Sequence, residues 1–427
     1  MAAAPELERG CGLPPELGRS GAVIARNRVE FAAENAFHAG MLTYGFKREG
    51  NCGVGDTLIL GIESSCDETA AAVVAGGRRI LSSVVASQVS IHRKYGGVVP
   101  ELASREHLRQ IVPVVREALA ESGVALAQMD AFAVTQGPGL VGALLVGITY
   151  GKALAMSLGK PLIGVNHLEG HVHAVLLEAR AAGLAPEFPA LCLIVSGGHT
   201  LLYEVRSEPV NDRSEALHFS YTRIGGTRDD AAGEAYDKVA RMLALGYPGG
   251  PVMDQLAVHG DPAAMRFSEP KMKDNPYDFS FSGAKTAVFY HLRKHPELHE
   301  EIAARQQALA GGMRKAAELL PLCSPATLGI IASFQKAVVG DLAGRTLAAA
   351  GQFGARSVLV SGGVAANRAL RHAFAEESPR RGLETFFPSP QLSTDNAAMI
   401  AAAAYPKFVA GEHADMMLNA EANLPLA

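Results

Sequence analysis

The sequence predicts an α/β protein in which one structural unit occurs twice. Six apolar segments of strand length form two triplets, each with a Gly-rich turn inside it: residues 58–65, 69–74 and 79–87, then residues 190–195, 200–205 and 218–225. Each triplet leads into helical apolar spacing, at 107–122 and at 229–245. Three strands joined by short turns form an antiparallel meander. The same meander at the start of two α/β stretches indicates two similar halves.

The other predicted elements follow in chain order. Strands are expected at 131–136 and 161–166, and a late strand at 357–363 leads into a helix at 365–377. Residues 286–350 have mostly helical patterns, and the charged run at 295–305 is interpreted as a solvated helix face.

The expected domain organisation has four parts. Residues 1–56 lack sustained periodicity and are expected to be a poorly ordered extension, so that structure starts at Thr57. The others are a first lobe at 57–186, a second lobe at 187–410 with a helical insertion at about 286–350, and a tail at 411–427.

Composition is that of a globular protein with a large core. The 427 residues suggest two or three structural units. The net charge of −4 gives no general nucleic-acid signal, although a local basic patch would not show in it. The chain has no Trp and only 6% aromatic residues, which disfavours platforms on which nucleic-acid bases stack. Five Cys without a CxxC pair argue against disulfides and structural zinc. No spanning helix, secretory leader or transit peptide is evident, so a cytoplasmic protein is expected.

The segment GPGLVG at 137–142 fits the dinucleotide fingerprint GxGxxG between a strand and a helix. That fingerprint needs an acidic residue at the end of the next strand, where this chain has Asn166. We therefore interpret these glycines as sites of tight helix–sheet packing. Lys152 is likewise no P-loop lysine, because GxxxxGK[ST] does not precede it.

The segment HLEGHVH at 167–173 carries a candidate metal site. His167 and His171 are spaced i, i+4, which places both imidazoles on one side of a helix. Glu169 lies about 200° around that helix from His167, so it is badly placed as a base for metal-bound water. The spacing therefore favours metal binding over zincin-type proteolysis; two surface histidines are the alternative. His173 is expected to be outside the ligand set.

A third ligand is available in the segment STDNAAM at 393–399. Asp395 is the candidate, although Ser393, Thr394 and Asp395 could equally cap the apolar helix that follows. Two His and one carboxylate leave coordination positions open, as suits Fe(II) or Zn(II).

Three strand-end loops are candidates for anion binding: residues 64–69, 196–200 and 361–367. Gly-rich turns after strands present backbone N–H groups to phosphates, although hairpins need glycine in any case. Beside the first loop, Asp67 and Glu68 form a pair of carboxylates whose alternative role is turn capping. Glu234 and Asp237 share a helix face, where they would accept ribose hydroxyls if buried.

These motifs together resemble the Kae/Qri/TsaD family, and within it the bacterial TsaD group. The matching segments span about 58–410, and they are GIESSCDET, YGGVVPELASREH, QGPGLVGALLVG, HLEGH, LIVSGGHT, DDAAGEAYDKVA, YPGGP, DFSFSGAKT, VSGGVAANRALR and STDNAAMIA. The chain departs from the family in residues 1–56, in a longer segment at 294–325 and in its tail.

The resemblance implies a duplicated actin-like, sugar-kinase-like and Hsp70-like ATPase fold with a central cleft. It also implies a tRNA adenosine threonylcarbamoyltransferase that uses threonylcarbamoyl-AMP, modifies the adenosine 3′ of the anticodon in tRNAs reading ANN codons, and releases AMP. The implied partners are tRNA, a paralogous TsaB-like subunit, a TsaE-like ATPase and a TsaC-like supplier of the adenylate, with no membrane.

The resemblance also implies roles for particular residues. His167, His171 and Asp395 would hold one divalent metal, Fe(II) first and Zn(II) as the alternative, and Asp67 and Glu68 would sit at the reacting centre. The adenylate would be lined by Ile194, Val195, Ser196, Gly197, Gly198, Asp237, Gly250, Asp254 and Asn367. Two other functions are weighed: a glycoprotease-type metalloprotease, which lacks a base on the histidine face, and a non-catalytic nucleotide-binding paralogue, which should have lost the histidine pair.

Overall fold

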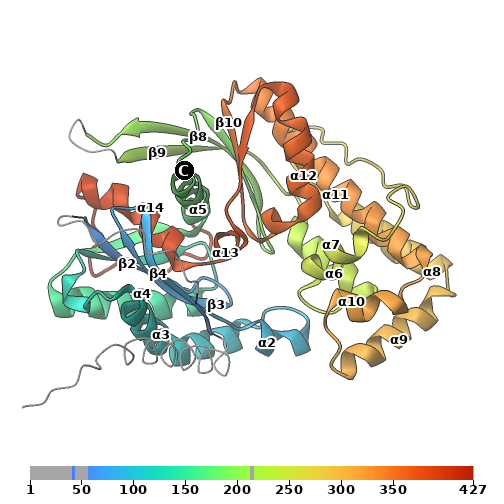
Figure 1. Cartoon of the computed structure of the whole chain (residues 1–427), viewed down its shortest axis with the longest axis horizontal. Coiled ribbons are helices and arrows are strands. Elements are labelled where there is room, and N and C mark those ends of the chain that lie inside the picture. Colours follow the sequence, from blue (N-terminus) through green and yellow to red (C-terminus); the bar gives the residue numbers. More distant parts are fainter. Residues whose placement is uncertain (1–40, 44–55, 212–215, 427) are drawn as a thin grey trace, which may run out of the picture.

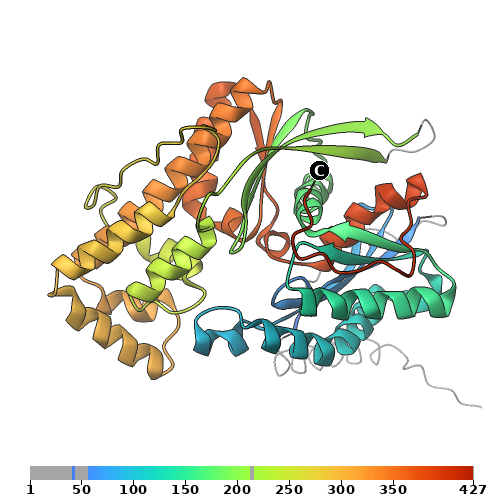
Figure 2. The same ribbon diagram turned by 180° about the vertical axis from the view of Figure 1, so that it is seen from behind.

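A computed structural model describes residues 41–43, 56–211 and 216–426. Figure 1 and the reverse view in Figure 2 show two α/β lobes side by side, with the helices α5 and α14 between their sheets. Each lobe is built around one of two mixed β-sheets.

The first sheet holds the first predicted triplet. Its strands are β1 (Met41–Thr43), β2 (Leu58–Glu63), β3 (Glu68–Ala75), β4 (Arg79–Ser87), β5 (Ala131–Gly137) and β6 (Leu162–Asn166). They lie in the order β1-β4-β3-β2-β5-β6, with β2, β3 and β4 antiparallel and with β5 and β6 parallel to β2.

The second sheet repeats this topology. Its strands are β7 (Ala190–Val195), β8 (Thr200–Pro209), β9 (Leu217–Gly226), β10 (Ser357–Ser361) and β11 (Glu384–Phe386). In the order β9-β8-β7-β10-β11, the first three are antiparallel and the last two run parallel to β7. The order and directions match those of β4-β3-β2-β5-β6, so the predicted duplicated α/β fold is confirmed.

Helices cover both faces of each sheet. In the first half they are α2 (Val89–His92), α3 (Pro100–Ser122), α4 (Val141–Leu158) and α5 (His167–Ala181). The second half contains α6 (Ala232–Met242), α7 (Gly249–Ala257), α8 (Ser282–Lys294), α9 (Leu298–Ala310), α10 (Ala316–Leu319), α11 (Pro325–Gln352), α12 (Arg368–Glu377), α13 (Pro390–Ser393) and α14 (Ala397–Ala410). The predicted helical stretch at 286–350 is therefore confirmed.

Two of these helices pack against the sheet of the other half. The apolar face of α14 covers β2 and β3 of the first sheet, where Ile400 and Ala401 pack against Ile59. The helix α5 covers the second sheet, where Val172 packs with Ile194. Because α5 and α14 also pack against each other, they join the two lobes and bring their N-terminal ends together.

The glycines of 137–142 serve close packing, as the sequence analysis interpreted them. A Cβ on Gly139 would come within 2.6 Å of the Ser65 carbonyl oxygen, and one on Gly142 within 2.5 Å of the Ser104 hydroxyl. Real Cβ atoms do not approach other atoms so closely, so α4 can reach its neighbours only with glycine at these positions.

The charged run at 295–305 is not simply a solvated face, and that interpretation is wrong for Arg305. This side chain is fully buried. Its Nε donates to the Leu243 carbonyl at 2.8 Å, and Nη1 lies 3.1 Å from the Glu301 carboxylate. Glu301 in turn accepts from Thr327 at 2.8 Å. The pair thus connects α9 with the end of α6 and the start of α11.

The apolar helices α4 and α11 have the length and composition that a membrane span requires. The expectation that no such helix exists is therefore wrong on those two criteria. In the folded chain α11 is mostly buried, and Leu144 and Ile148 of α4 pack into the core beneath the first sheet.

The expectation that structure starts at Thr57 is also wrong. Met41–Thr43 pair antiparallel with Val84–Ala86 and add an edge strand to the first sheet, and Asp56 forms an ion pair with Arg79 at 3.0 Å. The rest of the extension lies outside the described residues, so its predicted disorder stays a prediction.

A chain that begins at Thr57 is expected to fold cooperatively and to keep its activity. It loses a three-residue edge strand and the partly exposed Asp56–Arg79 pair, and such exposed pairs contribute only about 0–1 kcal/mol. Thermal unfolding followed by circular dichroism, compared with the full chain, measures the difference. Loss of a cooperative transition would contradict the prediction.

Candidate metal centre and active site

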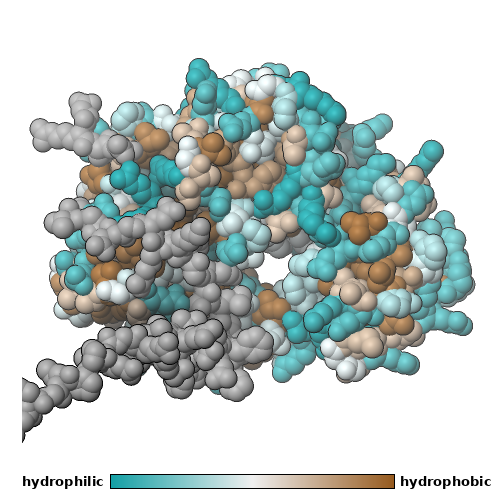
Figure 3. All heavy atoms as spheres, in the orientation of Figure 1, coloured by the Kyte–Doolittle hydropathy of each residue, from teal (hydrophilic) through white to brown (hydrophobic). Residues whose placement is uncertain are grey.

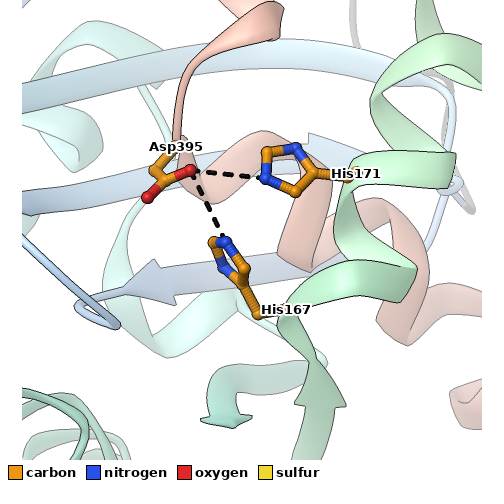
Figure 4. Close-up of side chains that lie close together, drawn as sticks. All are labelled: His167, His171 and Asp395. Atoms are coloured by element: carbon orange, nitrogen blue, oxygen red, sulfur yellow. Dashed lines mark ion pairs between the residues drawn. The ribbon is translucent and has the colours of Figure 1, made fainter. Parts of the chain in front are cut away.

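The structure brings the two predicted histidines and the predicted aspartate together. Asp395 Oδ1 lies 3.5 Å from Nε2 of His167 and 3.4 Å from Nε2 of His171, as Figure 4 shows. Their three candidate ligand atoms lie within 4.8 Å of one another. The juxtaposition that the sequence predicted is thus confirmed.

Two helix starts position this triad. The helix α5 begins at His167, where the side chain of Asn166 accepts from the Leu168 N–H at 2.9 Å and caps it. At the start of α14 the cap is Asn396, which accepts from the Met399 N–H at 3.0 Å. Asp395 itself is not the cap. Its carboxylate is therefore left to face the histidines, which resolves the alternative that the sequence left open.

The triad fits a transition metal by its donor chemistry. His171 is fully buried, and neither of its ring nitrogens has a hydrogen-bond partner in the described structure. Buried polar atoms are normally paired, and the ring nitrogens of His171, one of them 3.4 Å from Asp395, are therefore suited to act as metal ligands. Two imidazoles and one carboxylate suit Fe(II) or Zn(II).

Glu63 is a further residue of this site, and the sequence analysis missed it. Its carboxylate is fully buried at the end of β2 and lies 3.0 Å from Nδ1 of His167. It also accepts from the Thr135 hydroxyl at 2.8 Å and from the Ser65 N–H. A carboxylate behind a metal-ligating imidazole fixes its tautomer and orientation. The one acid at the end of the apolar strand LILGIE was the signal that could have revealed it.

Two carboxylates set the charge of His167. Burial works against a protonated His167, but Asp395 and Glu63 outweigh it and raise the pKa of His167 to about 9. Burial raises the pKa of Asp395, and the nearby His167 and His171 more than reverse this, so that its pKa is lowered. Without a metal, His167 therefore carries a proton beside an ionised Asp395 at neutral pH, and a bound cation would take the place of that proton.

The other polar residues of the histidine segment point elsewhere. Glu169 pairs with Lys407 at 2.9 Å, which agrees with its predicted distance from the histidine face. His173 packs edge-on against Phe219, and burial together with the charges of Arg180 and Lys407 lowers its pKa to about 3. Neither residue is available as a base at the triad.

Asp67 ends the loop between β2 and β3, and Glu68 is the first residue of β3, close enough to Asp395 for their charges to interact. Burial, with the charges of Asp67 and Asp395, raises the pKa of Glu68 well above its usual value. The Glu68 carboxylate accepts from the Ser87 hydroxyl at 3.1 Å. Asp67 also contributes to the raised pKa of Asp237, after burial as the main cause. The loop thus stands between the metal triad and Asp237.

The two Gly-rich turns of the second sheet meet at one edge, because β7 and β10 are parallel neighbours. Ile194 and Val195 end β7 as buried core residues, and the open turn of Ser196, Gly197 and Gly198 follows. Beside it, Gly362 has a φ of +92°, and a Cβ there would lie 2.4 Å from the Val195 carbonyl oxygen. Only glycine permits this contact between the turns.

Asp237 lies on α6 and holds the turn that begins α7. Its Oδ1 accepts from the Gly249 N–H at 2.6 Å, and the Gly250 N–H also lowers its pKa against the effect of burial. Glu234, its predicted neighbour, is different. It pairs with Lys238 at 2.8 Å on the half-exposed face of α6 and does not join the site.

Asp254 and Asn367 lie close together behind these turns. The Asp254 carboxylate forms an ion pair with Arg368 at 2.8 Å. The Asn367 side chain caps α12 by accepting from the Leu370 N–H at 2.9 Å, and donates to Gln335 at 2.8 Å. The side-chain amide of Asn367 has a second N–H and a second oxygen lone pair that a ligand could use. The predicted contact of Asp254 and Asn367 with an adenylate stays a prediction.

Comparison with known proteins identifies relatives along most of the chain. Residues 79–402 match the family model described as TsaD: tRNA N6-adenosine threonylcarbamoyltransferase. The enzyme of that name from Koribacter versatilis is 54% identical over 386 residues, covering 87% of this chain and 99% of the relative. The enzyme of that name from Symbiobacterium thermophilum is 51% identical, and the match covers 88% of this chain and 98% of the relative. Among solved structures, HypF of T. kodakarensis is 15% identical with a TM-score of 0.46, covering 84% of this chain and 48% of HypF.

Proposed function

Since the chain belongs to the family of tRNA N6-adenosine threonylcarbamoyltransferases, we propose that the triad and the loops around it carry out that transfer. The substrate is threonylcarbamoyl-AMP, and the acceptor is the exocyclic amine of the adenosine 3′ of the anticodon in tRNAs that read ANN codons. The amine bonds to the carbamoyl carbon, the bond to the phosphate oxygen breaks, and AMP leaves. The observation that carries the proposal is the triad of the buried His167 and His171 with the partly exposed Asp395, beside two Gly-rich turns.

The triad would hold one divalent cation, with Fe(II) proposed and Zn(II) as the alternative. Bound there, the metal supplies Lewis-acid polarisation of the threonylcarbamoyl group. The chain's own part is to fix the geometry. Glu63 holds Nδ1 of His167, so that Nε2 points at Asp395.

Asp67 and Glu68 are proposed to act at the reacting centre. The raised pKa of Glu68, caused by burial and by its acidic neighbours, favours its protonated form. Asp67 is proposed as the group that takes up the proton that the amine loses when the new bond forms. Two neighbouring carboxyl groups whose environments separate their protonation states are suited to such acid–base work.

The adenylate is proposed to lie across the second sheet's edge. Ile194 and Val195 lead into the turn at 196–198, where the N–H groups of Gly197 and Gly198 would bind the phosphate. The N–H of Ser196 already donates to the His199 carbonyl oxygen, so Ser196 would line the phosphate site through its side chain. Asp237, Gly250, Asp254 and Asn367 would contact its nucleoside. An attacking amine is a weak nucleophile, so holding both substrates in reach of each other supplies much of the acceleration.

The wider setting is also proposed from the family resemblance. The lobes are taken as residues 57–186 and 187–410, and the protein is taken as cytoplasmic. Its proposed partners are a TsaB-like paralogue, a TsaE-like ATPase and a TsaC-like enzyme that supplies the adenylate. The metalloprotease alternative lacks support, because Glu169 is paired with Lys407 away from the histidines.

Asp237→Ala is expected to weaken adenylate binding about 10-fold or more. A lost hydrogen bond to a ligand costs about 0.5–1.5 kcal/mol, and the turn at Gly249 that Asp237 holds in place would also lose its anchor. Calorimetric titration with a non-hydrolysable adenylate analogue measures the effect. Glu234→Ala, one turn earlier on α6, is the matched control and should bind normally. Unchanged affinity in Asp237→Ala would remove this residue from the site.

The reaction itself is tested with unmodified tRNA transcript, threonylcarbamoyl-AMP and the partner proteins. Mass spectrometry of the digested tRNA should show threonylcarbamoyladenosine. Peptide hydrolysis by the unaltered chain that disappears in His171→Ala, without any tRNA product, would instead establish the metalloprotease.

A further inference from the structure

A cavity of about 620 Å³ lies where the first half meets the second. One wall is the segment 90–96, which includes the end of α2 and the 3-10 turn Arg93–Tyr95. The opposite walls are the C-terminal end of α6 with the turn after it, and α9 with the residues that follow it. In Figure 3 the molecule is hollowed between its two lobes, beside the place where Figure 1 labels α6 and α7.

The lining of this cavity is strongly basic. Four of its lining residues are cations: Arg93, Lys94, Arg241 and Arg314. Asp237 is the single carboxylate in the lining. All four cationic residues are exposed to solvent. The chain as a whole has a net charge of −4, so this cluster is a local departure from the average.

Within the described part of the chain, none of these four cations forms an ion pair at 4.0 Å or less, and three of them contact backbone carbonyl oxygens or an aromatic ring. Arg93 donates from Nε to the Tyr247 carbonyl oxygen at 3.2 Å, which connects the two halves. Lys94 lies 4.9 Å from the ring centroid of Tyr95, and Arg314 donates to the Leu309 carbonyl oxygen. Carbonyl oxygens and rings do not neutralise a full charge, so the cluster is suited to a ligand with several negative charges.

We propose that this cavity binds the phosphodiester backbone of the tRNA around the adenosine that is modified. This inference rests on the proposed function and names the tRNA contact for the same site. Asp237, proposed above to contact the adenylate, forms part of the cavity wall, so the cavity adjoins the proposed adenylate site. A nucleotide whose amine enters that site carries phosphates on both sides. The adenylate has a single phosphate, for which the turn at 196–198 is already available. Four cations are more positive charge than that one phosphate would neutralise.

The segment at 294–325 gives this cavity a wall that the resemblance did not predict. Gln306, Leu309 and Arg314 line it, and all three lie within this longer segment. The ion pair of the buried Arg305 with the partly exposed Glu301 anchors α9 against α6 and α11, so this wall is held in place. The longer segment thereby adds the cation of Arg314 to the basic cluster.

The test is binding of an unmodified tRNA transcript to the full chain at several salt concentrations. Lys94→Ala and Arg314→Ala are each expected to weaken binding roughly 5- to 10-fold at 0.1 M salt. Each should also reduce the slope of log K against log salt by about 0.7–0.9, the value for one phosphate contact. Affinity for a non-hydrolysable adenylate analogue should stay unchanged in both variants.

Two further variants serve as controls. Arg314→Lys keeps the charge but not the guanidinium geometry, and should largely restore the salt slope. Arg380→Ala removes an exposed arginine that pairs with Glu376 and Glu377 outside the cavity, and should bind tRNA normally.

Two results would overturn the inference. One is an unchanged affinity and salt slope in Lys94→Ala and Arg314→Ala. The other is a loss of adenylate affinity in place of tRNA affinity, which would assign the cavity to the adenylate phosphate. Either result leaves the proposed transfer standing, whereas absence of any threonylcarbamoyladenosine from the unaltered chain, supplied with adenylate and partners, would overturn the proposed function itself.

Discussion

His171→Ala is expected to abolish metal binding and, with it, transfer. The imidazole of His171 is fully buried, its ring nitrogens have no hydrogen-bond partners among the described residues, and its Nε2 lies 3.4 Å from Asp395. Loss of a group that only supports a ligand already costs about 10- to 100-fold in metal affinity. Removal of a ligand itself should cost about 100-fold or more. Metal content of the purified chain, measured by plasma mass spectrometry, checks this.

The matched control for that variant is His173→Ala. It removes another buried imidazole from the same helix, two residues further on, where the ring packs against Phe219 instead of facing Asp395. It should lower stability but retain metal. Full metal occupancy in His171→Ala, or an equal loss in both variants, would contradict the assignment of His171 as a ligand.

Glu63→Ala is expected to have the second-largest effect. Its carboxylate lies 3.0 Å from His167 Nδ1 and accepts from Thr135, and both partners are buried. Without it, each buried donor that stays unpaired costs about 1–3 kcal/mol of unfolding free energy. Metal affinity should fall about 10- to 100-fold, because the imidazole loses the group that orients it. Metal titration and chemical denaturation measure the two effects separately.

Two variants separate orientation from stability. Glu63→Gln keeps an oxygen that can accept from His167, so it should retain more metal affinity than Glu63→Ala. Thr135→Val removes one donor to Glu63 without touching His167, and should lower stability with little change in metal affinity. Equal metal affinity in Glu63→Ala and the unaltered chain would show that Glu63 has only a structural role.

Local patterns in the sequence determined the parts of this protein that depend on neighbouring residues. Strand triplets follow from runs of apolar residues between Gly-rich turns, and their repetition revealed the duplicated fold. The i, i+4 spacing of His167 and His171 places them on one side of α5 whatever surrounds that helix. The same helical geometry correctly placed Glu169 away from the pair.

Only the tertiary structure decided what depends on contacts between distant segments. Asp395 meets the histidines because α14 and α5 pack together between the sheets, and no local periodicity records that packing. The buried roles of Glu63 and Arg305 were missed for the same reason, since a charged residue is assigned to solvent until its buried partners are known. The basic cavity also joins two halves of the chain. Acidic residues elsewhere in the chain offset these cations in the net charge. The basic cluster therefore exists only in the folded chain, where Arg93 and Lys94 line the same cavity as Arg314.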